Sequence, residues 1–109
     1  MQRFGRVGRL RAGAEAEYER QHANVWPEVL EATKRAGVHN YTIFRYGQWL
    51  FSYFEMAEGC SLDDLGEAVE TDEACQRWEE LMRDLVEPLA ESGDQIWWVP
   101  MKEVWHLPD

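Results

Sequence analysis

The stretch that decides the fold is residues 38–56, with the sequence VHNYTIFRYGQWLFSYFEM. β-Branched and aromatic residues dominate both halves of this stretch, and such residues are enriched in strands. Gly47 and Gln48 separate the halves at the position where a tight hairpin turn needs a permissive residue. We therefore predict a strand over residues 38–46 and its antiparallel hairpin partner over residues 49–56.

A strand and a helical region precede this hairpin. Residues 2–11 alternate weakly between apolar and polar and predict a strand, whereas residues 14–20 are rich in alanine and glutamate and predict a helix. Pro27 is poorly tolerated inside a helix. Either the helix kinks there, or it stops near residues 21–23 and restarts with Asn24 as its cap and Pro27 in its first turn.

The second helical piece runs to residue 35 and ends at Gly37, a usual position for glycine after a helix. After the hairpin, Ser61 is expected to open a helix that runs to about residue 70, because acidic residues in its first turn favour the helix dipole. Thr71 is expected to cap a further helix over residues 72–86. A loop over residues 89–96 and a last strand from residue 97 or 98 to residue 107 complete the prediction.

The predicted order is β-α-β-β-α-β within one domain over residues 1–109, which is the ferredoxin-like α+β arrangement with one antiparallel sheet. The helices of this arrangement lie on one face of the sheet. The opposite face carries large apolar residues and would be bare in a monomer. Two such sheets can cover each other, so a homodimer is expected.

Composition excludes several classes of function. The chain has a net charge of −10 and a pI of about 4.7, so it lacks the cationic surface that nucleic acids or anionic membranes require. A neutral polar ligand or a cation suits this charge better. Three of Arg3, Arg6, Arg9 and Arg11 alternate with apolar or small residues, and we expect them on the solvent side of the first strand.

Cysteine content and hydropathy bear on the compartment of the protein. The chain has two cysteines without metal-type spacing, which we interpret as reduced thiols of a cytoplasmic protein. The arginine-rich start has no following apolar run, so no signal peptide is expected. No stretch approaches the roughly 20 apolar residues of a membrane span.

Tyr18 and His22 form the strongest candidate for chemistry. They lie four residues apart in a predicted helix, so their side chains share one face. Histidine titrates near neutral pH and is a natural proton shuttle, and a neighbouring phenol can orient a hydroxyl-bearing ligand. The alternative is that this pair only packs in the core.

Other candidate residues are more ambiguous. Trp78, on the last predicted helix, is expected either to wall a cavity between helices and sheet or to pack in the core. Asn40 and Tyr41 are expected on opposite faces of their strand, so that at most one lines the cavity. No set of histidines and cysteines has zinc-type spacing, so no metal site is expected. Cys75 is not expected to be activated as a nucleophile, since no helix start or histidine adjoins it.

The sequence resembles the L-rhamnose mutarotase family over nearly its whole length. The resemblance rests on Tyr18 and His22, followed by Trp26-Pro27-Glu28, His39-Asn40-Tyr41, Cys75-Gln76-Arg77-Trp78 and Glu103-Val104-Trp105-His106-Leu107. It implies a dimeric α+β barrel, often with an exchanged C-terminal strand. It also implies an isomerase that interconverts the α and β anomers of L-rhamnose or a related 6-deoxy pyranose, with no cofactor.

The resemblance also implies roles for individual residues. The general acid falls on His22, and substrate contacts fall on Tyr18, Tyr41, Trp78 and Glu79. Some members of the family carry tryptophan in place of Glu79. In the implied reaction, His22 donates a proton to the ring oxygen while Tyr18 or a water receives another. The alternatives are a monooxygenase or haem-binding protein of the same architecture, and a sugar-binding dimer without activity.

Overall fold

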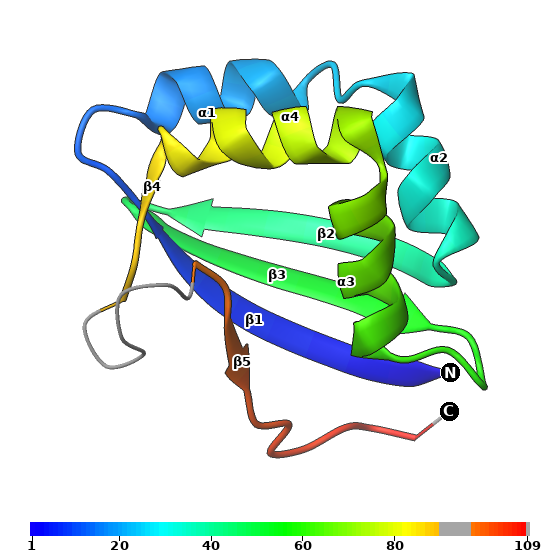
Figure 1. Ribbon diagram of the computed structural model, residues 1–109. Coiled ribbons are helices and arrows are strands. Elements are labelled where there is room, and N and C mark those ends of the chain that lie inside the picture. The colour runs from blue at the N-terminus through cyan, green and yellow to red at the C-terminus, as the bar shows by residue number, and fades with distance from the viewer. Residues whose placement is uncertain (90–96, 109) are drawn as a thin grey trace.

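The computed structural model describes residues 1–89 and 97–108 (Figure 1). In this part the chain forms β1 (Gln2–Leu10), α1 (Glu15–His22), α2 (Pro27–Arg35), β2 (Val38–Tyr46), β3 (Trp49–Met56), α3 (Leu62–Thr71), α4 (Glu73–Arg83), β4 (Val86–Glu87) and β5 (Val99–Met101). None of these helices combines the length and apolar character that spanning a bilayer requires.

The hairpin of β2 and β3 has the predicted bounds, with Gly47 at a φ of 60° in its turn. Its ladder runs from the pair Tyr46 and Trp49 towards Val38 and Met56. One irregularity interrupts the ladder near Asn40, which has a φ of 52° and lies where the register shifts. Bulges of this kind re-aim the side chains that follow them.

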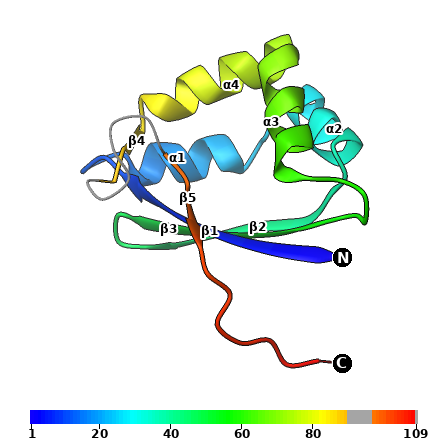
Figure 2. The same cartoon turned by 60° about the horizontal axis from the view of Figure 1, so that its bottom comes forward.

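The sheet confirms the ferredoxin-like prediction. Its strand order is β2-β3-β1-β4, and β1 pairs in antiparallel fashion with β3, β4 and β5. Figure 2 shows the helices together on one side of this sheet. The two short strands β4 and β5 both lie beside β1, so they divide between them the position of the fourth strand.

The core lies between the helices and this sheet face. Alternate residues of β3 point into it, because successive side chains of a strand face opposite ways. Leu50, Phe54 and Met56 are at most 1% exposed, and Leu10 of β1 is fully buried. The opposite face of β3 carries the intervening residues.

The break between α1 and α2 follows the second of the two arrangements that Pro27 allowed. Pro27 is the first residue of α2, but the cap is Trp26 and not Asn24. The physical reason is that a residue before proline is driven away from helical geometry. Trp26 accordingly has φ −60° and ψ 135° and takes the cap position, without a side-chain hydrogen bond.

The boundary between α3 and α4 also needs correction. Ser61 opens α3 as predicted, in a reciprocal capping box with Asp64. Thr71 is not the cap of α4, because it is still part of α3. Asp72 is the cap, and its carboxylate accepts a hydrogen bond from the Cys75 amide at 3.0 Å. The helix ends at residue 83, short of the predicted 86, since Val86 pairs with β1.

The last strand is much shorter than predicted. Only Val99–Met101 pairs with β1 as β5, and residues 102–108 form no strand. This segment continues past the sheet on the side away from the helices (Figure 2). Val104, Trp105 and Leu107 are more than half exposed along it. Apart from Leu89, the predicted loop over residues 89–96 lies outside the described residues.

The sheet face opposite the helices is rich in aromatic side chains. Phe44 and Tyr46 of β2 are 64% and 79% exposed, while Trp49 and Phe51 of β3 are 39% and 38% exposed. Phe44 lies opposite Phe51 in the ladder. The described residues therefore leave a large apolar surface open to solvent, which is unusual for a monomer.

Candidate active site

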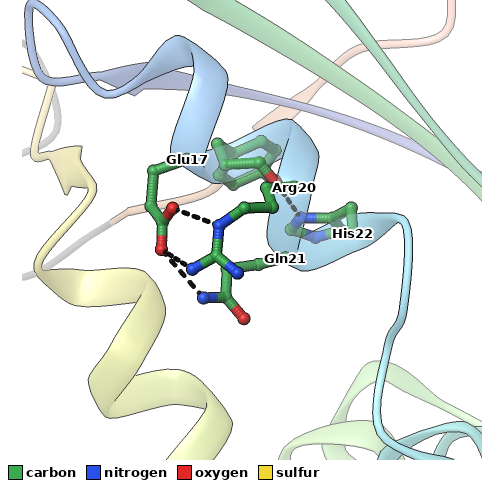
Figure 3. Close-up of polar contacts among 5 residues, drawn as sticks. Glu17, Arg20, Gln21 and His22 are labelled. Carbon is green, nitrogen blue, oxygen red and sulfur yellow. Dashed lines mark hydrogen bonds and ion pairs between the residues drawn. The ribbon is translucent and has the colours of Figure 1, made fainter.

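Helix α1 places Tyr18 and His22 side by side, facing the core. Their ring centroids lie 4.1 Å apart with an interplanar angle of 31°, and Tyr18 is 5% exposed. On the same helix Glu17 binds both Arg20 and Gln21 (Figure 3). These bonds hold the pKa of Glu17 at about 2.

A backbone hydrogen bond fixes the protonation pattern of His22. Its Nδ1 lies 2.9 Å from the Tyr18 carbonyl oxygen (Figure 3). A carbonyl oxygen only accepts hydrogen bonds, so Nδ1 carries the proton, and Nε2 of the neutral ring carries a lone pair. Burial lowers the pKa of His22, and the bond to Tyr18 opposes that effect. The neutral ring is therefore favoured at neutral pH.

Trp78 of α4 is both a core residue and a wall of the site. Its ring meets the His22 ring edge-on at 5.3 Å between centroids, and it meets Trp26 in the same way at 5.3 Å. Trp78 is 6% exposed. The two interpretations of its sequence position are thus compatible, because packing against His22 puts the indole at the cavity.

Tyr41 of β2 is held by a cation. Its hydroxyl oxygen accepts a hydrogen bond from Arg6 at 2.7 Å. The Arg6 guanidinium carbon also lies 4.8 Å from the Phe54 ring centroid and 5.2 Å from that of Trp98. The Arg6 Nε is buried without a hydrogen-bond partner among the described residues. Burial raises the pKa of Tyr41, although Arg6 opposes it.

Arg6 was not expected here. Three of the four arginines near the N-terminus were expected on the solvent side of this strand, and Arg6 is one that does not lie there. Its position in β1 shares the even numbering of Phe4 and Leu10, whose side chains contribute to the core on the helix side. The even residue number of Arg6 therefore already indicated that its side chain lies on the helix side of the strand. The glycines at positions 5 and 8 obscured it, because they carry no side chain that marks a face.

The expectation that at most one of Asn40 and Tyr41 lines the cavity holds for the inner cavity. Both residues border the wide groove, but only Tyr41 lines the inner cavity, whereas the Asn40 amide donates a hydrogen bond to Glu55 of β3 at 2.6 Å. The register shift between His39 and Thr42 decides which of the two residues faces the helices. No pattern in the sequence announced the bulge.

All five residues that the sequence singled out come together in one hollow. An open groove of about 1430 Å³ and an inner cavity of about 80 Å³ both have them in their walls. These residues come from three elements that are far apart in the chain. Helix α1 contributes Tyr18 and His22, β2 contributes Tyr41, and α4 contributes Trp78 and Glu79.

Burial dominates the electrostatics of the hollow. It raises the pKa of the Tyr18 phenol and that of the Glu79 carboxyl, in the latter case against the attraction of Arg83 and Arg6. Burial thus acts against the charged form of both groups. Within residues 1–89 and 97–108, no three histidine, cysteine or acidic side chains are grouped so as to hold a metal ion.

Cys75 lies in the first turn of α4, contrary to the expectation that no helix start adjoins it. A helix N-terminus ordinarily lowers a thiol pKa. Here burial and the neighbouring Asp72 raise the pKa of Cys75 to about 11. The thiol is thus protonated at neutral pH and is not an activated nucleophile.

Comparisons with known proteins agree on one family. A family model described as L-rhamnose mutarotase matches residues 3–107. An L-rhamnose mutarotase from Opitutus terrae is 35% identical over 100 residues, covering 90% of each chain. One from Listeria monocytogenes is 31% identical over 109 residues, covering 98% of this chain and 99% of that one.

Two solved structures share the fold. The crystal structure of an L-rhamnose mutarotase from Formosa agariphila has a TM-score of 0.76 at 21% identity, over 99% of this chain and all of that chain. A tetracenomycin F2 cyclase from Streptomyces glaucescens has a TM-score of 0.63 at 16% identity, with the same coverage. Since the second is a polyketide cyclase, the architecture alone does not decide the chemistry.

Proposed function

This chain belongs to the L-rhamnose mutarotase family, and from this membership we infer that it is an isomerase that interconverts the α and β anomers of L-rhamnose or a related 6-deoxy pyranose. The observation that supports this inference most directly is that His22 and Tyr18 line one partly enclosed hollow together with Trp78 and the other predicted substrate-contacting residues. A small neutral sugar suits a cavity in which burial acts against the charged forms of Tyr18, His22 and Glu79.

His22 is the proposed catalytic residue. Opening of the pyranose requires that the anomeric hydroxyl lose a proton while the ring oxygen gains one. The neutral His22 ring, with Nδ1 bound to the Tyr18 carbonyl, has its Nε2 free to take the anomeric proton. A second donor, which is a water or another group of the hollow, protonates the ring oxygen as the C1–O5 bond breaks. The C1–C2 bond of the aldehyde then rotates. As the ring closes on the other face, His22 returns its proton to O1 and the hydroxyl on C5 returns its proton to the second donor.

This use of His22 reverses the direction that the resemblance implied, in which His22 donates to the ring oxygen, because the Nδ1 proton is engaged by the Tyr18 carbonyl and Nε2 carries a lone pair. His22 acts as general base in opening and as general acid in closure.

The remaining residues of the hollow are proposed to hold the sugar. Trp78 offers an indole to the apolar face of the ring, while Tyr18, Tyr41 and Glu79 offer polar groups to its hydroxyls. The bond from Arg6 engages the Tyr41 oxygen as an acceptor, which leaves the Tyr41 hydrogen free to donate. The raised pKa of Tyr18 makes this phenol a hydrogen-bond donor and a poor proton acceptor.

The His22→Ala variant tests the function. Saturation-transfer NMR between the two anomers measures their exchange, with L-rhamnose compared against a small panel of other free sugars. The wild-type protein should accelerate exchange, and His22→Ala should lose about 10²–10⁴-fold of that acceleration with an unchanged circular dichroism spectrum. His39→Ala is the matched control, because His39 is exposed and lies outside both hollows. Unchanged exchange in His22→Ala would end the proposal.

We further propose that the protein is a homodimer located in the cytoplasm. The aromatic side chains on the open sheet face support a partner there, and a second copy of the same sheet is the simplest one. Cys60 and Cys75 are both free thiols, which fits a reducing compartment.

A further inference from the structure

Among the described residues, Glu79 is the only acidic residue in the wall of the inner cavity, and its carboxyl has no hydrogen-bond or ion-pair partner. It follows Trp78 in α4 and lines the inner cavity together with His22. Within the described part of the chain, it forms no hydrogen bond or ion pair, whereas Glu73 on the same helix is paired with Arg77. A partly buried carboxyl without a partner costs stability, so a purely structural role does not account for it.

The surroundings of Glu79 keep its protonated form accessible. Tyr18 and His22 of α1 and Tyr41 of β2 share the cavity with it, and none of these groups is charged in its favoured form at neutral pH. The positive charges that act on it are those of Arg83 on α4 and Arg6 on β1. Their attraction does not outweigh burial, and the pKa of Glu79 is raised.

The proposed reaction needs two proton-transfer groups, and His22 supplies only one. Its Nδ1 is engaged by the Tyr18 carbonyl, so a single nitrogen remains for chemistry. The phenols of Tyr18 and Tyr41 have raised pKa values and do not exchange protons readily near neutral pH. Among the titratable side chains that line the inner cavity, the group left for the second transfer is the Glu79 carboxyl, because the Arg83 guanidinium does not release its proton.

We propose that Glu79 is a catalytic residue of this hollow, which donates its carboxyl proton to the ring oxygen while His22 takes the anomeric proton. This inference rests on the proposed function. The O1–H bond breaks towards His22, C1=O1 forms, and the C1–O5 bond breaks with its electron pair on O5, which takes the Glu79 proton. Ring closure on the other face reverses each transfer, so both residues return to their starting states.

This division of labour predicts a bell-shaped pH profile. Activity falls at low pH as Nε2 of His22 gains a proton, and it falls at high pH as the Glu79 carboxyl loses its own. Glu79→Gln should remove the high-pH limb and lower the exchange rate by about 10²-fold or more. The amide keeps the size of the side chain but has no carboxyl proton to give.

Chemical rescue separates proton transfer from positioning. Glu79→Ala leaves room for a small carboxylic acid, so added formate should restore part of the anomer exchange, while sodium chloride at equal ionic strength should not. The control is Glu67→Gln, a carboxyl-to-amide change at an exposed position of α3 outside both hollows. It should keep the wild-type rate and pH profile.

The outcomes distinguish this inference from the proposed function. If the wild-type protein accelerates no anomer exchange, the function itself fails. If the wild type is active and Glu79→Gln retains its rate, Glu79 is not catalytic and the function stands. If Glu79→Gln is slow but keeps the high-pH limb, and formate does not rescue Glu79→Ala, then Glu79 only positions the sugar and the inference is overturned.

Discussion

At the scale of single residues, burial acts on His22 and Glu79 in opposite directions. It lowers the pKa of the imidazole and raises that of the carboxyl, because a less polar environment disfavours whichever form is charged. The two shifts bring the pKa values of His22 and Glu79 closer together. A neutral base and a protonated acid can therefore coexist in one hollow over a wider pH range than in water.

The raised pKa of Glu79 also predicts a pH-dependent stability. Because its folded-state pKa lies above the ordinary value of 4.5, the stability linked to this group is fully present below about pH 4.5. It is lost as the pH rises through the folded-state pKa. Glu79→Gln should therefore melt at a higher temperature than the wild type at pH 7, and at a similar temperature at pH 4.

Thermal unfolding followed by circular dichroism at both pH values measures this difference. Glu67→Gln controls for the loss of an exposed carboxylate and should show no comparable dependence on pH. A Glu79→Gln variant that is less stable than the wild type at pH 7 would mean that the carboxylate has a stabilising partner in the folded protein.

At the scale of secondary-structure elements, glycines with positive φ lie at junctions between a helix and a strand. Gly37 follows α2 with a φ of 93°, and a Cβ at this position would lie 2.6 Å from the Cys60 Sγ. A side chain there meets both a left-handed backbone and a collision. Gly13 has a similar φ of 88° but open space around it.

These two glycines make a matched pair for testing steric fit. Gly37→Ala and Gly13→Ala should each lose about 1 kcal/mol of unfolding free energy for the left-handed conformation. Gly37→Ala should lose a further 1–3 kcal/mol, of the order that overpacking costs. Urea denaturation of both variants measures the difference. Equal losses would show that Cys60 moves aside without cost.

At the scale of the whole molecule, the uncovered sheet face predicts self-association. Phe51 lies on β3 on the face away from the helices, with Val7 of β1 and Phe44 of β2 as its neighbours in register. Phe51→Lys should convert the proposed dimer into a monomer, because it places a charge in an apolar contact. Sedimentation analysis measures the mass of each form.

Ala16→Lys is the control for this change. It adds the same charge at an exposed position of α1, on the helix side of the sheet, and should leave the mass unchanged. A wild-type protein that sediments as a monomer at high concentration would refute the dimer, and the aromatic face would then need another partner.

The sequence by itself determined most of the element order, the hairpin bounds and the pairing of Tyr18 with His22, because these depend on local spacing. Tyr41, Trp78 and Glu79 were assigned substrate contacts only through the resemblance to a known family. Residues four apart share a helix face whatever surrounds them, which is why Tyr18 and His22 were predictable as a pair. The first turn of α3 was predictable in the same way, since its cap lies within a few residues of what it caps.

The tertiary structure alone decided what those residues experience. The bulge at Asn40 directs the Tyr41 side chain into the hollow. Arg6 lies on the helix side of β1, where its guanidinium donates a hydrogen bond to the Tyr41 hydroxyl oxygen. No local pattern in the sequence predicted that Glu79 has no partner among the described residues. None predicted that β5 is only three residues long. Burial and long-range contacts join segments distant in sequence, and these set each pKa and decide which polar groups remain free for chemistry.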